Sequence, residues 1–308
     1  MIRYLRHSEI DSEKWNQTVH NSLFSTIFAE YEMLDLLTGP DTWDAVVQDD
    51  YVAVMPLPYR KKGVLKYVYT PFFMPQMGIF SEHEVSPVEV DHFLSEVTKH
   101  FVLADIILNE KLNVEKRNMT FVSHSMSLQF PYNELFGNYS QNTKRNIKAA
   151  EKAECVITRQ GESVSDIIQL FVRNKGHQTE VHFTDNDYQR LLQVANYLIN
   201  RNLLEIYSVR TKDNLLAAGA FFVKDTNRSW FWFSGRDNHL SYCMPMFYLL
   251  NEYIHDHAET DLMLDFNGST NENVARLYRS FGGERYEIPF VRCYKNQFWK
   301  AILKLLGK

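Results

Sequence analysis

Lys144, Lys148 and Lys152 recur every four residues in the segment YSQNTKRNIKAAEK. On a helix that begins after Ser140 these three side chains would share one face. Lys144 and Arg145 would lie close to the helix N-terminus, where cations oppose the helix dipole. A sequence that accepts such repulsion often does so to bind a ligand. We therefore expect Lys144, Arg145 and Lys148 to hold a phosphate, a pyrophosphate or the end of a tRNA; the alternative is a solvated stripe of charge.

A second polar group lies between Arg236 and Tyr242, after a strand rich in Trp and Phe (230–233) and before a predicted helix. Helix N-termini bind anions through their unsatisfied N–H groups. We expect Arg236, Ser241 and Tyr242 to contact an anionic ligand here. The alternative is a plain connection between two elements.

Other chemistry finds little support in the spacing of residues. His255 and His257 are two apart on a predicted helix, so their side chains point away from each other. His177 and His182 have no Cys or carboxylate partner at the spacing of metal ligands. The chain also lacks a GxSxG elbow and a catalytic-cysteine signature. We expect neither a metal site nor a Ser or Cys nucleophile.

The segment DFNGSTNENVARLYRSFGGERY, residues 265–286, has the punctuation of a strand end followed by a short helix. Ser269 and Glu272 have the spacing of a capping box, and Gly282 stands where a left-handed C-cap is favoured. An apolar face runs along this helix and contains Val274, Leu277, Tyr278 and Phe281. These local features are enough to account for Tyr278 as a core residue, so they are not themselves evidence of a functional role.

The elements that must position these residues alternate between helices and short strands. In the second half the periodicities predict strands at 204–211, 215–223, 229–234, 262–266 and 287–293, and helices at 140–154, 164–174, 185–202 and 244–258. In the first half they predict helices at 24–37 and 85–103, a strand pair within 43–60, and strands at 104–108 and 119–128. We expect an α/β fold of the α+β type in two domains, 1–135 and 136–308.

Asn271, Tyr278 and Gly282, in this spacing after a strand, resemble the last helix of the GNAT superfamily of N-acyltransferases. The order of three antiparallel strands, helix, strand, helix and strand is similar too. The resemblance implies an acyl-CoA donor, a substrate contact at Asn271, and a Tyr278 phenol that protonates the departing thiolate. The segment 234–241 holds one glycine, where GNAT enzymes normally have a Gly-rich turn around the CoA pyrophosphate.

The motifs AAGAFFV, FWFSG, LDFNG and FGGE, in that order after the basic segment, resemble the Fem-type aminoacyl transferases. The resemblance spans residues 15–286 and implies two tandem GNAT-like domains with mixed, largely antiparallel sheets. It implies transfer of an acyl or aminoacyl group to an amine, with a charged tRNA as donor in the peptidoglycan members. Those members commonly carry a Lys at the position of Arg279, so Tyr278 and Arg279 are the catalytic candidates.

Composition indicates the cellular location of the protein and limits the partners that it is expected to bind. The chain has 308 residues, of which 45% are hydrophobic, and a net charge of −5, which argues against a protein that coats nucleic acid. Three dispersed cysteines form no disulfide framework, and the first residues lack the apolar core of a secretory signal. We expect a cytoplasmic protein.

The last residues, KNQFWKAILKLLGK, form a short basic amphipathic segment. Its expected apolar face contains Phe298, Trp299, Ile302, Leu305 and Leu306. We expect this segment to dock on its own chain, for which the first domain is a candidate. The alternative is peripheral contact with an anionic membrane.

These inferences combine into one main hypothesis and two alternatives. The main hypothesis is N-acyl transfer, with no metal, from an acyl-CoA or a charged tRNA to an amine acceptor. The first alternative is Fem-type aminoacyl transfer to a peptidoglycan precursor. The second is a GNAT-like protein that binds ligands without catalysis.

Overall fold

The computed structural model describes residues 1–63, 65–114, 119–176, 183–268 and 271–305. They form two compact units, of which unit 1 comprises Met1–Phe121 with Glu287–Lys308 and unit 2 comprises Val122–Tyr286.

This division differs from the expected boundary at residue 135. The chain enters unit 2 along strand β7 (Met119–Ser127) and leaves it along strand β13 (Glu284–Tyr294). The end of β7 pairs with β12 (Met263–Asp265) in unit 2, and the end of β13 pairs with β6 (Leu103–Ile107) in unit 1. Because strand pairing decides which unit each residue joins, both boundaries fall inside strands and not in a polar linker.

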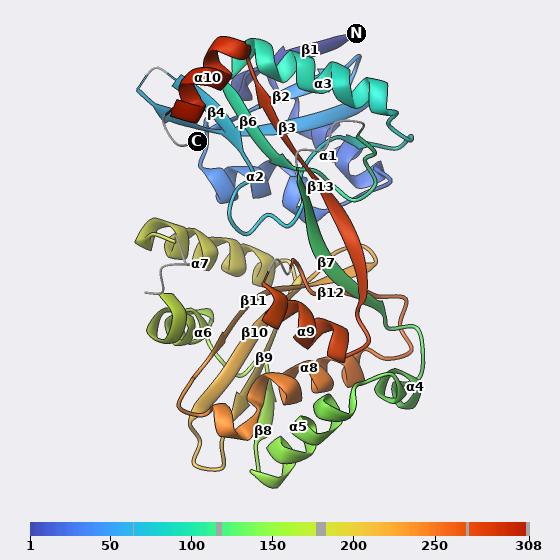
Figure 1. Ribbon diagram of the computed structural model, residues 1–308, viewed down its shortest axis with the longest axis vertical. Helices are drawn as coiled ribbons and strands as arrows, with labels where there is room; N and C mark the ends of the chain where they lie inside the picture. The colour runs from blue at the N-terminus through green and yellow to red at the C-terminus, as the bar shows by residue number, and fades with distance from the viewer. Residues whose placement is uncertain (64, 115–118, 177–182, 269–270, 306–308) are drawn as a thin grey trace. The chain divides into compact units, whose positions relative to one another are not determined.

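Unit 1 is built on antiparallel strands covered on both faces. Its further elements are β1 (Ile2–Leu5), α1 (Ser12–Asn21), α2 (Tyr31–Thr38), β2 (Trp43–Gln48), β3 (Ala53–Lys62), β4 (Leu65–Tyr69), β5 (Phe80–Ser81), α3 (Pro87–His100) and α10 (Gln297–Leu305), with short 3₁₀ turns at His7–Glu9 and Ile27–Ala29. In β2 and β3 inward and outward positions are buried alike, so both faces must be covered. Helices α1 and α2 cover one face, and α3 covers the other (Figure 1).

Unit 2 repeats this layered plan. Its further elements are α4 (Tyr132–Gly137), α5 (Gln141–Lys152), β8 (Val156–Arg159), α6 (Val164–Phe171), a π-helical turn (Val172–Gly176), α7 (Asp185–Asn200), β9 (Leu204–Arg210), β10 (Leu216–Lys224), β11 (Arg228–Arg236), a 3₁₀ turn (Ser241–Cys243), α8 (Pro245–Asp256) and α9 (Glu272–Ser280). Helices α6 and α7 lie on one face of β9–β11, and α5 and α8 lie on the other (Figure 1).

Neighbouring residues of β10 anchor the two faces of this sheet. Phe222 stacks on Tyr253 of α8, with ring centroids 3.6 Å apart. Phe221 points to the other face and stacks on Phe233, which in turn contacts Phe171 of α6. The alternation of strand side chains therefore gives each helix layer its own aromatic contact.

The two units share one topology. In unit 1 the antiparallel strands β2, β3 and β4 are followed by α3 and then by β6, which pairs with β4 in parallel. In unit 2 the antiparallel strands β9, β10 and β11 are followed by α8 and then by β12, which pairs with β11 in parallel. The expected α/β class with largely antiparallel sheets is confirmed.

Two expected segments differ in detail. The helix predicted over 24–37 is a 3₁₀ turn followed by α2, which begins at Tyr31. In α10 the buried residue is Leu303, while Phe298 and Leu305 are 65% and 87% exposed, so the expected apolar face is wrong in part. Leu306 lies outside the described residues. No helix in the described part of the chain is both long and apolar enough to cross a membrane.

Candidate functional site

The parallel strands β11 and β12 part near the middle of unit 2. They pair at Arg228, Ser229 and Trp230 of β11, and β12 ends opposite Trp230 at Asp265. Strand β11 continues to Arg236 and carries a β-bulge: Phe221 and Phe222 of β10 pair with Phe233 and Phe231, so Trp232 is the extra residue. Such bulges often re-aim side chains next to active sites.

Tyr278 of α9 lies at this point of separation. Its ring stacks on Phe266, with centroids 4.6 Å apart, and meets Phe231 edge-on at 6.2 Å. Phe231 is the first residue of β11 beyond the β12 pairing, and Phe266 directly follows β12. Tyr278 is 6% exposed, and its burial, followed by the nearby Asp265 carboxylate, raises the pKa of its phenol. The phenol is therefore a neutral hydrogen-bond donor at neutral pH.

The structure adds His124 of β7 to this group. Its ring centroid lies 6.3 Å from that of Tyr278, and its backbone carbonyl accepts a hydrogen bond from Phe266 N at 2.9 Å. Burial, followed by the positive charges of Arg279 and Arg285, lowers the pKa of His124. A neutral imidazole can accept a proton, so a donor and an acceptor of protons lie together.

A buried carboxylate ties together the strands around this site. Asp265 accepts hydrogen bonds from Arg228 Nη1 at 2.8 Å, Tyr286 Oη at 2.6 Å, Ser123 Oγ at 3.2 Å and Asn267 N at 2.9 Å. Each partner lies on or beside a different strand, namely β11, β13, β7 and β12. The network therefore holds the start of β11 against the end of β12, the strand that precedes α9 in the chain.

The basic helix α5 joins the end of α9. Ser140 N donates to Ser280 O at 2.9 Å, and the hydroxyls of Thr143 and Ser280 are 2.8 Å apart. Lys144 follows Thr143 directly, and Arg279 precedes Ser280. The structure therefore brings two separately expected groups, the basic helix and the end of the Tyr278 helix, to one corner of unit 2.

The charged side chains at this corner are mostly exposed. Lys144 Nζ donates to Gly137 O at 2.9 Å, and Arg145 Nη2 donates to Asn142 Oδ1 at 3.2 Å. Arg279 forms an exposed ion pair with Glu272. Exposed pairs of this kind contribute little, so a phosphate could replace the partner of Arg279. Lys148, one turn further along α5, is exposed as well.

Asn271 lies at the opposite end of α9 and has a structural task. It is the N-cap residue, and its side chain accepts a hydrogen bond from Asn273 N at 2.9 Å. The expected capping box required Ser269 as the N-cap and Glu272 at the third helical position, and that expectation is wrong because Glu272 is the first residue of α9. Ser269 itself lies outside the described residues. Gly282 follows α9 with φ of +88°, as the C-cap expectation required.

Six backbone N–H groups in the loop after β11 already have acceptors. The N–H groups of Asp237, Asn238 and His239 donate to Ala217 O, Asn174 Oδ1 and Asp237 Oδ1. Those of Ser241, Cys243 and Met244 donate to carbonyls within the loop itself. Arg236, Ser241 and Tyr242 are exposed on this loop, whose 3₁₀ turn packs against α5. These six N–H groups are therefore not available to a phosphate.

Unit 1 contains the same parallel pair, but its own chain occupies the space beyond it. Strand β4 pairs with β6 as far as Tyr69 and Asp105. Beyond that point Met77 forms a parallel bridge with Leu108, and Phe80 pairs with Val54 of β3. The separation of strands next to a buried Tyr is therefore a feature of unit 2.

Gly283 lies between α9 and β13, where the backbone passes close to Tyr278 and Phe266. A Cβ atom there would lie 2.9 Å from Tyr278 O and 3.1 Å from the Phe266 ring. We expect Gly283→Ala to lower the free energy of unfolding by about 1–3 kcal/mol through overpacking and to reduce turnover by displacing Tyr278. Chemical denaturation and a transfer assay would measure both. Gly137→Ala is the matched control, because a Cβ at Gly137 meets no atom within 4 Å; equal losses in both variants would contradict the prediction.

The role of four members of this site was not anticipated from the sequence. His124 lies in a short alternating strand, where a lone histidine is most often a core residue. Arg228 was expected in a polar turn, but it is the first residue of β11 and contacts Asp265. Asp265 and Tyr286 are the first and last residues of the segment 265–286. The one signal in the sequence was an acidic residue at the end of a predicted buried strand.

Metal ligation was not expected. Within the residues that the structure describes, no cluster of three His, Cys, Asp or Glu side chains could hold a metal ion. His257 contacts Glu205 at 2.9 Å. His177 and His182 lie outside the described residues.

Residues 137–286 match a family model described as an acetyltransferase (GNAT) domain. No curated protein matches the chain in sequence.

Solved structures extend the likeness over the whole chain. The fold is similar to FemX, with a TM-score of 0.69 and 11% identity over 99% of this chain and 100% of that chain. It is also similar to L-PGS from Bacillus licheniformis (TM-score 0.54, 10% identity, 97% and 98% covered). A third similar structure is Saccharomyces cerevisiae N-myristoyltransferase with bound myristoyl-CoA (TM-score 0.50, 12% identity, 96% and 82% covered).

These identities are low, so the structural matches establish the fold, and the expected likeness to Fem-type proteins is confirmed at that level. The chain therefore has the two-unit fold of FemX, its residues 137–286 match the model of a GNAT acetyltransferase domain, and that match supports acyl transfer as its activity.

Proposed function

We propose that this protein is an N-acyltransferase that moves an acyl or aminoacyl group from a phosphate-bearing donor to an amine. The observation that carries the proposal is the parting of β11 and β12 beside the buried phenol of Tyr278. The acyl arm of the donor would lie along β11 beyond Trp230, between aromatic side chains. The reacting carbonyl would then lie within reach of Tyr278.

The residues can serve both proton transfers of the reaction. The amine nitrogen attacks the donor carbonyl carbon, a C–N bond forms, and the C–S bond of a thioester or the C–O bond of an aminoacyl ester breaks. Tyr278, protonated at neutral pH, donates to the leaving sulfur or oxygen. His124, held neutral by its lowered pKa, accepts the proton released by the amine.

Side chains would contribute most of the binding to the donor phosphates, because six N–H groups of the loop after β11 already have acceptors. Lys144, Arg145, Lys148 and Arg279 supply positive charge at the corner where α5 meets α9, and Arg236 supplies it on the neighbouring loop. Acyl-CoA and a charged tRNA both present phosphates to such a surface. The similarity to N-myristoyltransferase with bound myristoyl-CoA favours acyl-CoA as the donor. The lack of a Gly-rich turn after β11 favours a charged tRNA.

A transfer assay tests the proposal and selects the donor. Acetyl-CoA, myristoyl-CoA and an alanyl-tRNA are each incubated with the protein and three amines: a peptidoglycan stem peptide, spermidine and glucosamine. Mass spectrometry identifies the amide product. Product from one donor class supports the proposal and names that donor. Absence of product with every donor, in a protein that shows no thermal shift with them, contradicts it.

The internally bonded loop favours a second candidate function, a GNAT-like protein that binds ligands without catalysis. This candidate predicts a rise in Tm with a donor, by mass action, but no amide product. The same two measurements therefore separate the two functions.

Replacing Lys144 and Arg145 together by Ala is expected to raise KM for the donor about 10-fold with little change in kcat. These exposed cations bind the donor equally in the ground and transition states and make only weak contacts within the fold. Steady-state kinetics at two salt concentrations would measure the effect, which should shrink at high salt. Lys212→Ala, an exposed lysine elsewhere in unit 2, is the control; an unchanged KM in the double variant would reject the role.

A further inference from the structure

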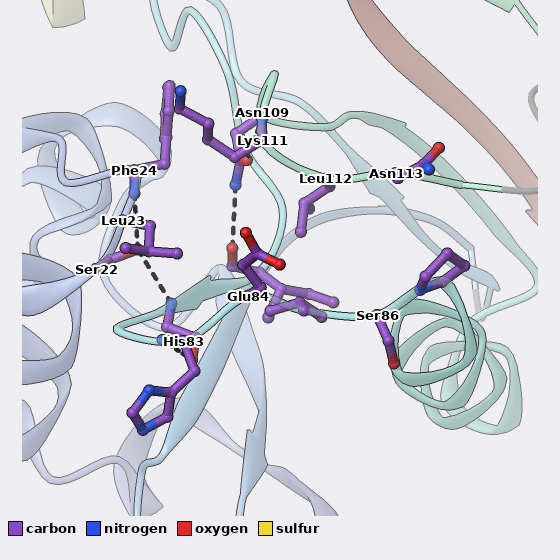
Figure 2. Close-up of a pocket in the computed structure, with 14 residues that line it drawn as sticks. Ser22, Leu23, Phe24, His83, Glu84, Ser86, Asn109, Lys111, Leu112 and Asn113 are labelled. Atoms are coloured by element: carbon purple, nitrogen blue, oxygen red, sulfur yellow. Dashed lines mark hydrogen bonds between the residues drawn. The ribbon is translucent and has the colours of Figure 1, made fainter.

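Unit 1 contains a cavity that the proposed transfer site does not use. It has a volume of about 510 Å³ and is lined by residues 22–24, 79, 81, 83–87, 109 and 111–113 (Figure 2). All of these residues belong to unit 1, whereas the residues of the transfer site belong to unit 2. Small-molecule sites typically occupy roughly 300–1,000 Å³, so the cavity could hold a compact ligand.

Two buried polar side chains hold the walls in place. Asn109, which is 1% exposed, donates from Nδ2 to Ile79 O at 3.0 Å and accepts from Lys111 N at 3.1 Å. Ser22 Oγ accepts from Phe24 N at 3.2 Å and from Ser81 N at 3.0 Å. Both bonds to Ser22 use its oxygen, so its hydroxyl proton is left to donate. The cavity is therefore preformed, which lowers the cost of ordering it around a ligand.

Two opposite charges line this cavity without neutralising each other. Within the described part of the chain, neither the Glu84 carboxylate nor the Lys111 ammonium forms an ion pair or a side-chain hydrogen bond. In Figure 2 the Glu84 side chain points into the space between the 109–113 segment and the start of α3, while the His83 ring points away from it. A ligand with both an ammonium and a carboxylate group would complement these charges.

The remaining lining adds an apolar surface and free backbone donors. Leu23, Phe24, Ile79, Val85 and Leu112 contribute the apolar area. The N–H groups of Glu84 and Val85 donate to no acceptor among the described residues. Extended backbone with free N–H groups is a common means of binding the carbonyls of a peptide.

We propose that this cavity binds a short zwitterionic peptide with an apolar side chain. Its ammonium group pairs with Glu84, its carboxylate pairs with Lys111, and its side chain contacts Phe24 and Leu112. The N–H groups of Glu84 and Val85 bind its peptide carbonyl. This inference does not depend on the proposed transfer reaction, because it concerns residues of unit 1 alone.

Isothermal titration of the full-length protein with the dipeptide Leu-Ala tests the inference. We expect saturable binding of Leu-Ala and at least 10-fold weaker binding of N-acetyl-Leu-Ala amide, which keeps both side chains but carries neither charge. Absence of saturable binding up to about 10 mM would overturn the inference. Equal affinity for the charged and the blocked peptides would overturn it as well.

Variants at the two charges locate the site. Glu84→Gln and Lys111→Met are each expected to weaken Leu-Ala binding about 10-fold, which corresponds to about 1.4 kcal/mol. Both side chains are exposed, so the fold should be unaffected. Glu82→Gln and Lys295→Met are matched controls, because these exposed residues of unit 1 do not line the cavity. An equal loss in test and control variants, or no loss in the test variants, would contradict the assignment.

Discussion

Asp265→Ala is expected to lower the free energy of unfolding by about 3–5 kcal/mol, the largest change in stability that we predict for one side chain. Asp265 is fully buried and accepts four hydrogen bonds, one of them from the largely buried Arg228 guanidinium. Removal of the carboxylate takes one hydrogen-bond acceptor from the Arg228 guanidinium and one from the Tyr286 hydroxyl. Both groups lie where little water can replace it. The cost therefore includes the loss of a buried carboxylate partner by a largely buried charge and exceeds that of a single neutral hydrogen bond.

Urea unfolding monitored by tryptophan fluorescence measures this effect. Asp261→Ala is the control, because Asp261 is exposed close to β12 and should change stability by less than about 0.5 kcal/mol. Asp265→Asn keeps an acceptor oxygen but loses the charge, so its loss should lie between the other two. A loss below about 1 kcal/mol for Asp265→Ala would mean that water or another carboxylate compensates Arg228.

Tyr278→Phe is expected to reduce kcat by about 10²–10³-fold with little change in donor KM, the range of a general acid that acts in the transition state. The substitution removes one oxygen and keeps the ring that stacks on Phe266 and contacts Phe231. The fold should therefore be preserved. Steady-state measurement of amide formation with the donor found in the transfer assay would provide both constants.

Tyr139→Phe is the control for this prediction. Tyr139 is also buried in unit 2, and its hydroxyl has no hydrogen-bond partner within the described residues. Removal of that hydroxyl should leave kcat unchanged and raise the free energy of unfolding by about 1 kcal/mol, since an unsatisfied polar group is removed. Equal kcat for Tyr278→Phe and the wild type would exclude Tyr278 as the acid and favour the non-catalytic alternative.

Local physics made much of the fold predictable. Helix α5 begins after Ser140, whose side chain accepts from Thr143 N, and α8 begins at Pro245, where the missing N–H costs little. The strands β9, β10 and β11 begin and end within two residues of their expected bounds. The helix predicted from residue 24 was wrong at its start, because the Phe28 and Ala29 side chains are buried through a 3₁₀ turn and not along a helix face.

The candidate site was only partly predictable. The basic residues of α5 stand out because they repel one another on a helix, and Tyr278 stands out because of its spacing from Asn271 and Gly282. Nothing local distinguishes His124 from a core histidine, or Arg228 from a turn residue. Their significance depends on contacts with residues far away in the chain, such as the pair between Arg228 and Asp265.

The sequence by itself determined the identity of the elements, because capping, periodicity and glycine placement act over a few residues. It also singled out Tyr278 and the basic residues of α5 as candidates for the chemistry. Only the tertiary structure decided where β12 stops alongside β11, that Tyr278 lies at this point, and that the corresponding space in unit 1 is filled by Met77 and Phe80. Those features depend on the registers of strands that are distant in sequence, and no local preference encodes such a register.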